Sequence, residues 1–207
     1  MKMNKIKINT IFESIQGEGK YAGTPMLFIR TSGCTRACDF CDTKYHTEGT
    51  YMTIESIIKT IKKSKLDYVC WTGGEPLLWR KQILSVMSKT LKKEHHLETN
   101  GDLLKFEDVM LDFYYTAISP KELKTVNAIV KEMREVSRDD YDVKIVTDFK
   151  KVGTSMLKYA TMLMPLTLYD KKKDLKIQQR VWDYCVKNNI KFTPRYQYWI
   201  WDKKRKI

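Results

Sequence analysis

The sequence has no long run of apolar residues. No stretch of its 207 residues approaches the roughly 18 consecutive apolar residues that a membrane-spanning helix needs. The first five residues, MKMNK, carry no apolar core of the kind found in signal peptides. Internal repeats and low-complexity segments are also missing. These absences predict a cytoplasmic protein without a membrane partner.

Cysteines are few, and their arrangement argues against a disulfide framework. Of the five cysteines, three stand within one short loop, where neighbouring thiols pair only with strain. Cys70 and Cys185 lie in apolar or helical surroundings, which predicts buried free thiols. This pattern indicates a reducing compartment.

Acidic residues are fewer than basic ones. The sequence has 25 Asp and Glu and 38 Lys and Arg, which gives a net charge of +13. Such an excess attracts nucleic acids or anionic substrates. Here the lysines are scattered through every predicted helix, and only residues 171–173 and 203–206 form tight basic runs. The distribution favours a solvated basic surface, and we do not expect a nucleic-acid partner.

Length and residue pattern predict one α/β domain over residues 1–207. Apolar strands alternate with helices of 3.6-residue apolar periodicity, which favours parallel pairing with the helices outside. About six parallel strands are too few for a closed eight-stranded barrel, so an open, partial TIM-like barrel follows. The expected strands are residues 5–12, 25–30, 68–71, 95–99, 113–118, 141–146, 160–165 and 190–196, and the expected helices are 53–61, 79–91, 122–137 and 175–188.

Three closely spaced cysteines form the most informative motif of the sequence. Cys34, Cys38 and Cys41 have the spacing C-x3-C-x2-C in the cysteine loop (residues 33–43), directly after a buried strand. Thiolates bind soft metal centres, and a [4Fe-4S] cluster normally takes four cysteines. With three, one iron keeps an open coordination position where chemistry can take place. Two alternatives stay open: a zinc site completed by His46, and three unrelated structural cysteines.

Polar signatures stand at the ends of four predicted strands. They are the cysteine loop and residues 72–75 (TGGE), 99–101 (TNG) and 119–121 (SPK). In a parallel sheet these strand ends lie at the same edge. That edge forms the open end of a barrel, called the mouth below, where α/β folds bind ligands. The Glu75 carboxylate suits an ammonium group; the alternative is an ordinary helix N-terminal acid. A glycine-rich loop over residues 14–23 allows close backbone approach to a ligand, or is a plain turn.

The cysteine loop and the Gly-Gly-Glu segment resemble the radical S-adenosylmethionine (SAM) superfamily. The resemblance implies a [4Fe-4S] cluster held by Cys34, Cys38 and Cys41, whose open iron is chelated by SAM. Reductive cleavage of SAM then yields a 5′-deoxyadenosyl radical. The residues implied in cofactor binding are Phe40, Asp42, Gly73, Gly74, Glu75, Asn100, Ser119 and Lys121.

Within that superfamily, the chain resembles the 7-carboxy-7-deazaguanine synthase family of 7-deazapurine (queuosine and archaeosine) biosynthesis. The segments that carry the resemblance are SIQGEG at 14–19, GTP at 23–25, FIR at 28–30, GC at 33–34, CDT at 41–43, TGGEP at 72–76, ETNG at 98–101 and SPK at 119–121. They cover the first 120 residues in the family's order, and the combination is specific.

The resemblance also implies a reaction. The substrate, 6-carboxy-5,6,7,8-tetrahydropterin, would lose ammonia as its ring contracts to 7-carboxy-7-deazaguanine, with SAM acting catalytically. Glu18 and Arg30 are implied in catalysis, and Mg²⁺ is implied with Thr43 as a ligand. A flavodoxin- or ferredoxin-like electron donor and a homodimer are further expectations. The implied substrate-binding residues are Ile15, Gln16, Gly17, Glu18, Arg30 and Thr72.

The part of the chain after residue 120, which ends in the C-terminal segment 166–207, resembles the family only loosely. Tyr198 stands where a histidine is expected, and Met164 where some members carry a glutamine, so neither is assigned a role. Two other classes remain. One is a radical SAM activase of a partner enzyme, although such activases do not share the Gln-Gly-Glu-Gly loop. The other is a zinc-dependent RNA-binding module, suggested by His46, the basic charge and twelve tyrosines.

Overall fold

The computed structural model describes residues 4–39, 41, 46–108, 112–133, 137 and 139–202. Its strands are β1 (Lys5–Ile15), β2 (Pro25–Thr31), β3 (Thr50–Thr53), β4 (Tyr68–Gly73), β5 (Glu94–Thr99), β6 (Tyr115–Ile118), β7 (Tyr141–Thr147), β8 (Met162–Pro165) and β9 (Lys191–Phe192). They form one sheet in the order β3-β1-β2-β4-β5-β6-β7-β8-β9. Six parallel pairings join β2 to β9 through β4, β5, β6, β7 and β8, whereas β1 runs antiparallel to both β2 and β3.

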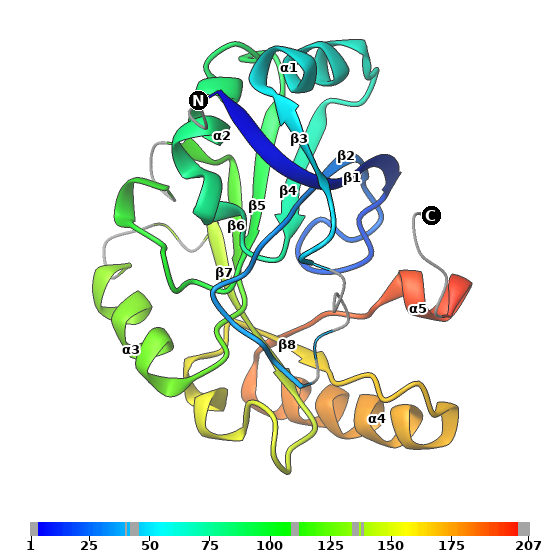
Figure 1. Ribbon diagram of the computed structural model, residues 1–207. Coiled ribbons are helices and arrows are strands. Elements are labelled where there is room, and N and C mark those ends of the chain that lie inside the picture. Colours follow the sequence, from blue (N-terminus) through cyan, green and yellow to red (C-terminus); the bar gives the residue numbers. More distant parts are fainter. Residues whose placement is uncertain are drawn as a thin grey trace.

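Helices connect the strands and cover the outer face of the curved sheet (Figure 1). The helices between strands are α1 (Ile54–Lys63), η1 (Pro76–Trp79), α2 (Arg80–Met87), α3 (Leu123–Glu132), η3 (Thr154–Tyr159) and α4 (Lys171–Asn188). Helix α5 (Tyr196–Trp201) follows the last strand. In the described part of the chain, no helix is both long and apolar enough to cross a membrane. The alternation confirms the predicted α/β class and its open, partial barrel.

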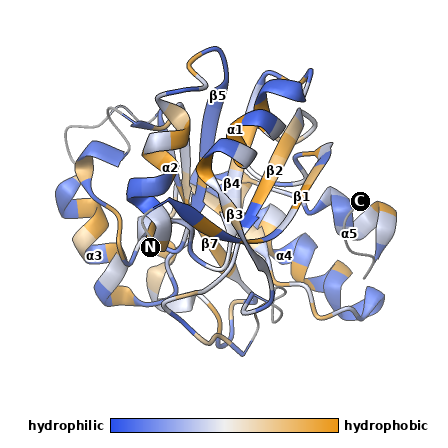
Figure 2. Ribbon diagram, turned by 45° about the horizontal axis from the view of Figure 1, so that its top comes forward, coloured by the Kyte–Doolittle hydropathy of each residue, from blue (hydrophilic) through white to orange (hydrophobic). Residues whose placement is uncertain are grey.

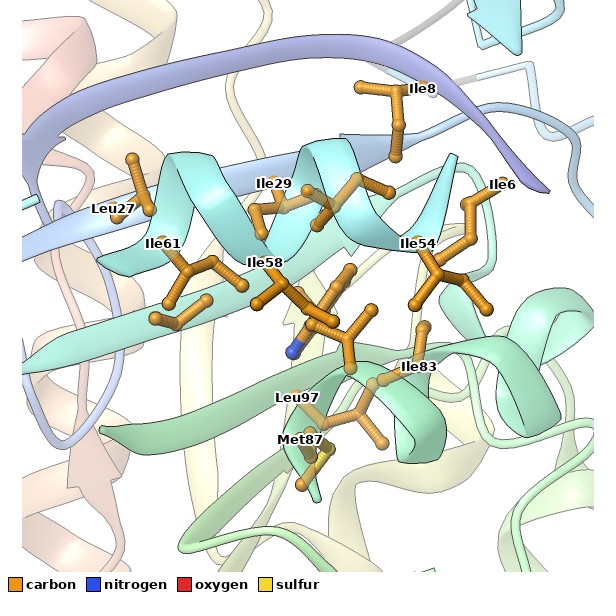
Figure 3. Packing of buried hydrophobic residues seen from close by; sticks show 14 of the residues in the cluster. Ile6, Ile8, Leu27, Ile29, Ile54, Ile58, Ile61, Ile83, Met87 and Leu97 are labelled. Carbon is orange, nitrogen blue, oxygen red and sulfur yellow. The ribbon is translucent and has the colours of Figure 1, made fainter. Parts of the chain in front are cut away.

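Helix α1 shows how the sequence sets one of these elements. The Thr53 side chain caps the helix by accepting a hydrogen bond from the Ser56 backbone N–H at 3.1 Å. Leu27 and Ile29 of β2 pack against the apolar face of the helix (Figure 3). The predicted apolar stripe is confirmed, because its members are buried: Ile54, Ile57, Ile58 and Ile61.

Two apolar clusters fill the space between the sheet and the helices. One lies under α1 and α2 and contains the fully buried Trp71, and the other lies under α3, η3 and α4. Successive strand residues face opposite sides. Trp71 therefore packs outward, while its neighbour Cys70 joins Met26 and Phe28 in a third, inward cluster. Figure 2 shows β2 as largely apolar and the surrounding helices as mixed.

Two boundaries in the last part of the chain differ from the prediction. The final strand, expected over 190–196, is only the two-residue β9, because Pro194 cannot donate a ladder hydrogen bond, and α5 begins at Tyr196. Helix α4 begins earlier than expected, because the Asp170 side chain accepts a hydrogen bond from the Lys173 backbone N–H at 3.1 Å.

The helix expected over residues 79–91 is shorter than predicted. Helix α2 ends at Met87, and the Leu91 side chain, expected on its buried face, is 84% exposed. The Thr90 hydroxyl donates to the Val86 carbonyl at 2.9 Å, which closes the helix end. The apolar residues therefore keep the helical spacing as far as Leu91, beyond the residue at which the helix ends.

The first strand is longer than predicted and has two antiparallel neighbours. It continues into the expected loop because Ser14 and Ile15 pair with Met26 and Pro25 of β2. Strand β3 and the short helices η1 and η3 were not predicted, since four to six residues show no usable period. The parallel strands number seven in the described residues, one more than the roughly six expected.

Candidate active site

The cysteine loop leaves the carboxyl end of β2. Cys34, Cys38 and Cys41 are in no disulfide, and each is partly buried. The Cys41 backbone N–H donates to the Cys38 carbonyl at 3.1 Å. Burial raises the pKa of the Cys38 thiol, and nearby Lys121 acts against this rise. A cation beside a thiol favours the thiolate that binds metal.

The three thiols are not gathered around a single ion. Among the described residues, which include these cysteines and His46, no three His, Cys, Asp or Glu side chains converge closely enough to hold one metal ion. The His46 carbonyl accepts a hydrogen bond from the Gly33 N–H at 2.7 Å, which fixes the start of the cysteine loop to the chain that follows it. A four-iron cluster is larger than one ion, so its cysteines stand further apart. Three thiols on one loop fit such a cluster better than they fit zinc.

The end of β4 lies directly against the cysteine loop. Gly73 has a backbone φ of +133°, and a Cβ there would collide with the Thr31 backbone. A Cβ on Gly74 would collide with the Gly33 carbonyl oxygen and would lie 3.2 Å from the Cβ of Cys34. Only glycines allow this approach, which forms a cradle of backbone atoms beside the cysteines.

Glu75 is fully buried, and both of its carboxylate oxygens accept hydrogen bonds. The donors are the Leu77 N–H at 3.0 Å, the Thr99 hydroxyl at 2.8 Å and the Asn100 N–H at 2.8 Å. Burial raises the pKa of this carboxyl, while the three bonds act against the rise. These contacts give Glu75 the structural role that the sequence left as the alternative. A contact with the ammonium group of SAM stays a prediction.

Two further strand ends reach the same mouth. The Asn100 side-chain amide donates toward Cys34 Sγ across 3.8 Å. At the end of β6, the Ser119 N–H donates to the Thr99 carbonyl at 2.8 Å, and Lys121 Nζ donates to the Ser119 hydroxyl at 2.9 Å. The predicted convergence of four strand ends is therefore confirmed.

A network of charged side chains lies inside the barrel. Lys144 of β7 is 3% exposed, and its Nζ donates to Glu18 Oε2 and to Glu98 Oε2, both at 2.9 Å. The other oxygen of Glu18 accepts from Arg195 Nε at 3.2 Å and from Gln197 Nε2 at 2.7 Å. These five residues, called the interior network below, hold Glu18 in one position.

Burial and mutual charge set the protonation states in the interior network. Burial disfavours the Glu18 carboxylate, but Lys144 and Arg195 outweigh this effect and lower the pKa of Glu18 to about 2. Burial raises the pKa of Glu98, with Lys144 acting against the rise. Burial also disfavours the charge on Lys144, but the two carboxylates hold its pKa above its usual range. Lys144 therefore stays charged between two acids.

The C-terminal segment packs over the glycine-rich loop. The Tyr196 N–H donates to the Gly17 carbonyl at 3.0 Å, and the Gly19 N–H donates to the Thr193 hydroxyl at 2.6 Å. A Cβ on Gly17 would collide with the Gln197 side chain, so this packing depends on a glycine. The loop contributes Glu18 to the interior network and is more than a plain turn.

Tyr198 and Met164, the two departures from the family pattern, have structural surroundings. The Tyr198 hydroxyl donates to Asp174 at 2.7 Å, which joins α5 to α4, and burial and this carboxylate raise the pKa of Tyr198 to about 12. Met164 is buried in β8 and pairs with Val146 of β7. Neither contact points to a bound ligand.

The remaining predicted substrate residues fall into two groups. Arg30 and Thr72 are paired neighbours on β2 and β4, and Gln16 Nε2 lies 3.4 Å from Glu98 Oε1. Ile15 is not brought to them, because its side chain is 49% exposed and lines a groove beside α5. The structure therefore joins Gln16 to the interior network and leaves the Ile15 side chain outside it.

Three residues with roles implied by the resemblance lie outside the described residues. They are Phe40 and Asp42, expected to bind the cofactor, and Thr43, expected to bind Mg²⁺. Their roles stay predictions.

Four members of the interior network had no role predicted from the sequence: Lys144, Glu98, Arg195 and Gln197. A signal for the first was present, since Asp142 and Lys144 place two charges at alternate positions of an otherwise apolar strand. Charges on one face of a buried strand must be paired, and such pairs are frequent at functional sites. Arg195 and Gln197 carry no comparable local signal.

Comparison with known proteins adds to this geometry. A family model described as "Radical SAM superfamily" matches residues 28–165. A protein of Thermoplasma acidophilum named 7-carboxy-7-deazaguanine synthase is 39% identical over 144 residues, which cover 67% of this chain and 68% of that protein. Proteins of the same name from Hyperthermus butylicus and Pyrobaculum aerophilum are 31% and 30% identical, over 92% and 97% of this chain and 90% and 97% of their own lengths. The chain belongs to the 7-carboxy-7-deazaguanine synthase family of radical SAM proteins.

A solved structure agrees with this family in its fold. The crystal structure of QueE from Escherichia coli matches with a TM-score of 0.58 over 93% of this chain and 94% of that one, at 16% identity. The match confirms the partial barrel. The relatives also extend the 7-carboxy-7-deazaguanine synthase resemblance beyond the motifs of the first 120 residues, into the last third of the chain.

Proposed function

We propose that this chain converts 6-carboxy-5,6,7,8-tetrahydropterin to 7-carboxy-7-deazaguanine with loss of ammonia, by a radical ring contraction that uses SAM catalytically. The observation that carries the proposal is that β5 connects the two motif-bearing regions. Glu98 of β5 belongs to the interior network with Glu18, and Asn100, two residues later, reaches Cys34 at the mouth. The names of the relatives support the same reaction.

The cofactors would lie at the mouth. Cys34, Cys38 and Cys41 would hold the [4Fe-4S] cluster, and the backbone cradle at Gly73 and Gly74 would receive the methionine end of SAM. When bound together, cluster and SAM supply a 5′-deoxyadenosyl radical. The chain's own task is to place the substrate below this point and to keep water away from it.

The interior network suits an anionic substrate that carries N–H donors. Its two carboxylates, Glu18 and Glu98, are balanced by Lys144 and Arg195. Arg30 adds a further cation, and a guanidinium binds a carboxylate through two parallel hydrogen bonds. Because the pKa of Glu18 is about 2, this side chain stays ionised and accepts hydrogen bonds without donating a proton. Glu18 thus positions the pterin, and Arg30 its carboxylate.

Arg30→Lys is expected to slow product formation by roughly tenfold to a hundredfold, because a point-charge ammonium cannot reproduce the two-point grip on the carboxylate. The release of 5′-deoxyadenosine without product should rise at the same time. Liquid chromatography of both compounds measures the two effects. Arg180→Lys is the matched control, since Arg180 lies over the Phe149 ring much as Arg30 lies over Phe12. Equal coupling in Arg30→Lys and wild type would remove Arg30 from the substrate site.

Mg²⁺ is part of the proposal, with Thr43 as its protein ligand. A hydroxyl oxygen, the substrate carboxylate and water together make a chemically reasonable set for this hard cation. We expect Mg²⁺ to increase turnover and Thr43→Ala to weaken the dependence, as measured by Mg²⁺ titration. Thr47→Ala, an exposed threonine in the same part of the chain, should titrate as the wild type does. Indistinguishable titrations of Thr43→Ala and wild type would contradict the assignment.

The partners of the enzyme also remain proposals. The reaction needs one-electron reduction of the cluster, for which a flavodoxin- or ferredoxin-like protein in the cytoplasm is suited. We further propose a homodimer, and sedimentation equilibrium measures that state directly. A monomer at micromolar concentration would contradict it.

The proposed function is tested with anaerobically reconstituted protein, dithionite, SAM and the carboxypterin. The expected result is 7-carboxy-7-deazaguanine, identified by mass, in large excess over the SAM consumed. Consumption of SAM without this product would favour a radical SAM activase. Protein that holds zinc and no acid-labile sulfide would favour the RNA-binding module.

A further inference from the structure

Arg36 lies between Cys34 and Cys38 and is bound to two carboxylates. Its Nε donates to Asp102 Oδ2 at 2.6 Å and its Nη2 to Asp102 Oδ1 at 2.5 Å. The same Nη2 lies 2.8 Å from Glu122 Oε1. The side chains of Arg36 and Asp102 are 20% and 16% exposed. Exposed ion pairs contribute little to stability. A pair that is joined by two hydrogen bonds and has limited access to water holds its two side chains in a defined geometry.

Asp102 collects further donors from two separate elements. The Thr35 hydroxyl donates to Asp102 Oδ2 at 2.8 Å, and the Thr125 hydroxyl donates to Asp102 Oδ1 at 2.9 Å. Thr35 and Arg36 belong to the cysteine loop, whereas Thr125 belongs to α3. Asp102 therefore joins the cysteine loop to the turn after β5 and to the start of α3.

Asn100 makes the second connection between the same turn and the cysteine loop. Its side-chain amide donates to the Thr35 hydroxyl at 2.9 Å and toward Cys34 Sγ across 3.8 Å. Its side-chain oxygen accepts from the Asp102 N–H at 2.9 Å, and its own N–H donates to the buried Glu75. The first half of the cysteine loop is thus fixed to parts of the barrel that do not depend on a bound cluster.

We propose that Arg36 and Asp102 are positioning residues that hold Cys34 and Cys38 in place before the cluster is inserted. The inference rests on the proposed function only in taking these cysteines as cluster ligands. A loop that must be ordered on binding loses part of its affinity to conformational entropy, and a loop that is already ordered does not. Metal sites are accordingly most precise where other contacts fix their ligands in advance.

The test uses the cluster-free protein as well as the loaded one. In Arg36→Gln and in Asp102→Asn, we expect iodoacetamide to modify Cys34 and Cys38 about tenfold faster than in wild type, a change equivalent to about 1.4 kcal/mol. Peptide mass spectrometry resolves each cysteine separately. After reconstitution, both variants should lose iron to a chelator several-fold faster than wild type. Neither measurement depends on turnover.

Arg80→Gln and Asp108→Asn are the matched controls. Arg80 and Asp108 form a comparable ion pair, with side chains 21% and 2% exposed, and Arg80 also donates to the Leu103 carbonyl. Its loss loosens the same turn after β5 without removing a contact of the cysteine loop. We expect thiol reactivity and iron loss in both control variants to equal those of wild type.

Cys70 and Cys185 serve as internal reporters, since both are buried away from the cysteine loop. Their reaction rates should not change in Arg36→Gln or Asp102→Asn. Three outcomes would overturn the inference: wild-type rates at Cys34 and Cys38, an equal effect in Arg80→Gln, or faster reaction at all five cysteines, which would indicate general unfolding. A protein that shows the expected thiol rates but forms no deazaguanine would refute the proposed function and leave this inference standing.

Discussion

Alanine in place of any one of Cys34, Cys38 and Cys41 is expected to abolish turnover and the brown colour of the reconstituted protein. Under the proposed assignment each of the three thiolates would hold one iron, and Cys70 and Cys185 are packed in apolar clusters of the core instead of in the cysteine loop. Iron and sulfide analysis, the visible spectrum and product formation measure the loss.

Cys70→Ala and Cys185→Ala are the matched controls. Burial raises the pKa of Cys70 well above its usual range and that of Cys185 to about 11, so neither is a ready thiolate. We expect both variants to keep cluster and activity, with a packing loss of about 1–2 kcal/mol. A colourless Cys70→Ala protein with an intact fold would overturn the assignment of ligands.

Lys144→Met is expected to lower the free energy of unfolding by about 3 kcal/mol and to impair turnover severely. The substitution fills a similar volume but leaves Glu18 and Glu98 buried without their shared cation, and one unpaired buried charge is strongly destabilising. Urea unfolding followed by circular dichroism measures the change. Lys173→Met is the control: that side chain is 70% exposed and its ion pair in the described part of the chain is with Asp170, so we expect a change below about 0.5 kcal/mol.

The defect of Lys144→Met should shrink as the pH falls. In wild type the pKa of Glu18 is about 2, below the 4.5 of a free side chain, so its contribution to stability is present above pH 4.5 and is lost toward pH 2. Without Lys144, the pKa values of Glu18 and Glu98 both rise, and mild acid neutralises the buried carboxylates of the variant first. The difference in unfolding free energy from wild type is therefore largest at neutral pH.

A double-mutant cycle separates this cause from simple loss of packing. Glu98→Gln removes one of the two charges that Lys144 neutralises, so it should recover part of the stability lost in Lys144→Met. Strict additivity of the two substitutions, or a defect of equal size at pH 7 and pH 4, would show that the charges of the interior network are not coupled.

Local motifs made much of this site predictable. The cysteine loop and the segments at Gly73, Asn100 and Ser119 each stand at the end of a recognisable strand. Because parallel strands end at the same edge, their meeting at one mouth follows from topology alone. The helical stripe of α1 was equally clear, since its isoleucines repeat with the helical period.

Contacts between distant parts of the chain could not be predicted in this way. Glu18 and Arg195 are 177 positions apart, and they meet only because the C-terminal segment folds back onto the glycine-rich loop. The contacts of Glu75 were likewise not predictable, because its donors Thr99, at the end of β5, and Asn100, directly after it, are brought to Glu75 only by the packing of the barrel. The apolar residues also keep their helical spacing past the end of α2. The helix ends there because the Thr90 hydroxyl binds the Val86 carbonyl, a contact that the apolar pattern does not indicate.

The central claim is that this chain regenerates SAM while it contracts the pterin ring, and substrate deuterated at C6 tests it most directly. In that case the radical would take the C6 hydrogen and later return one from the methyl group of 5′-deoxyadenosine, where the label would mix with two hydrogens. We therefore predict deuterium in SAM recovered after turnover, with product in large excess over 5′-deoxyadenosine. One 5′-deoxyadenosine released per product, together with recovered SAM free of deuterium, would contradict the account.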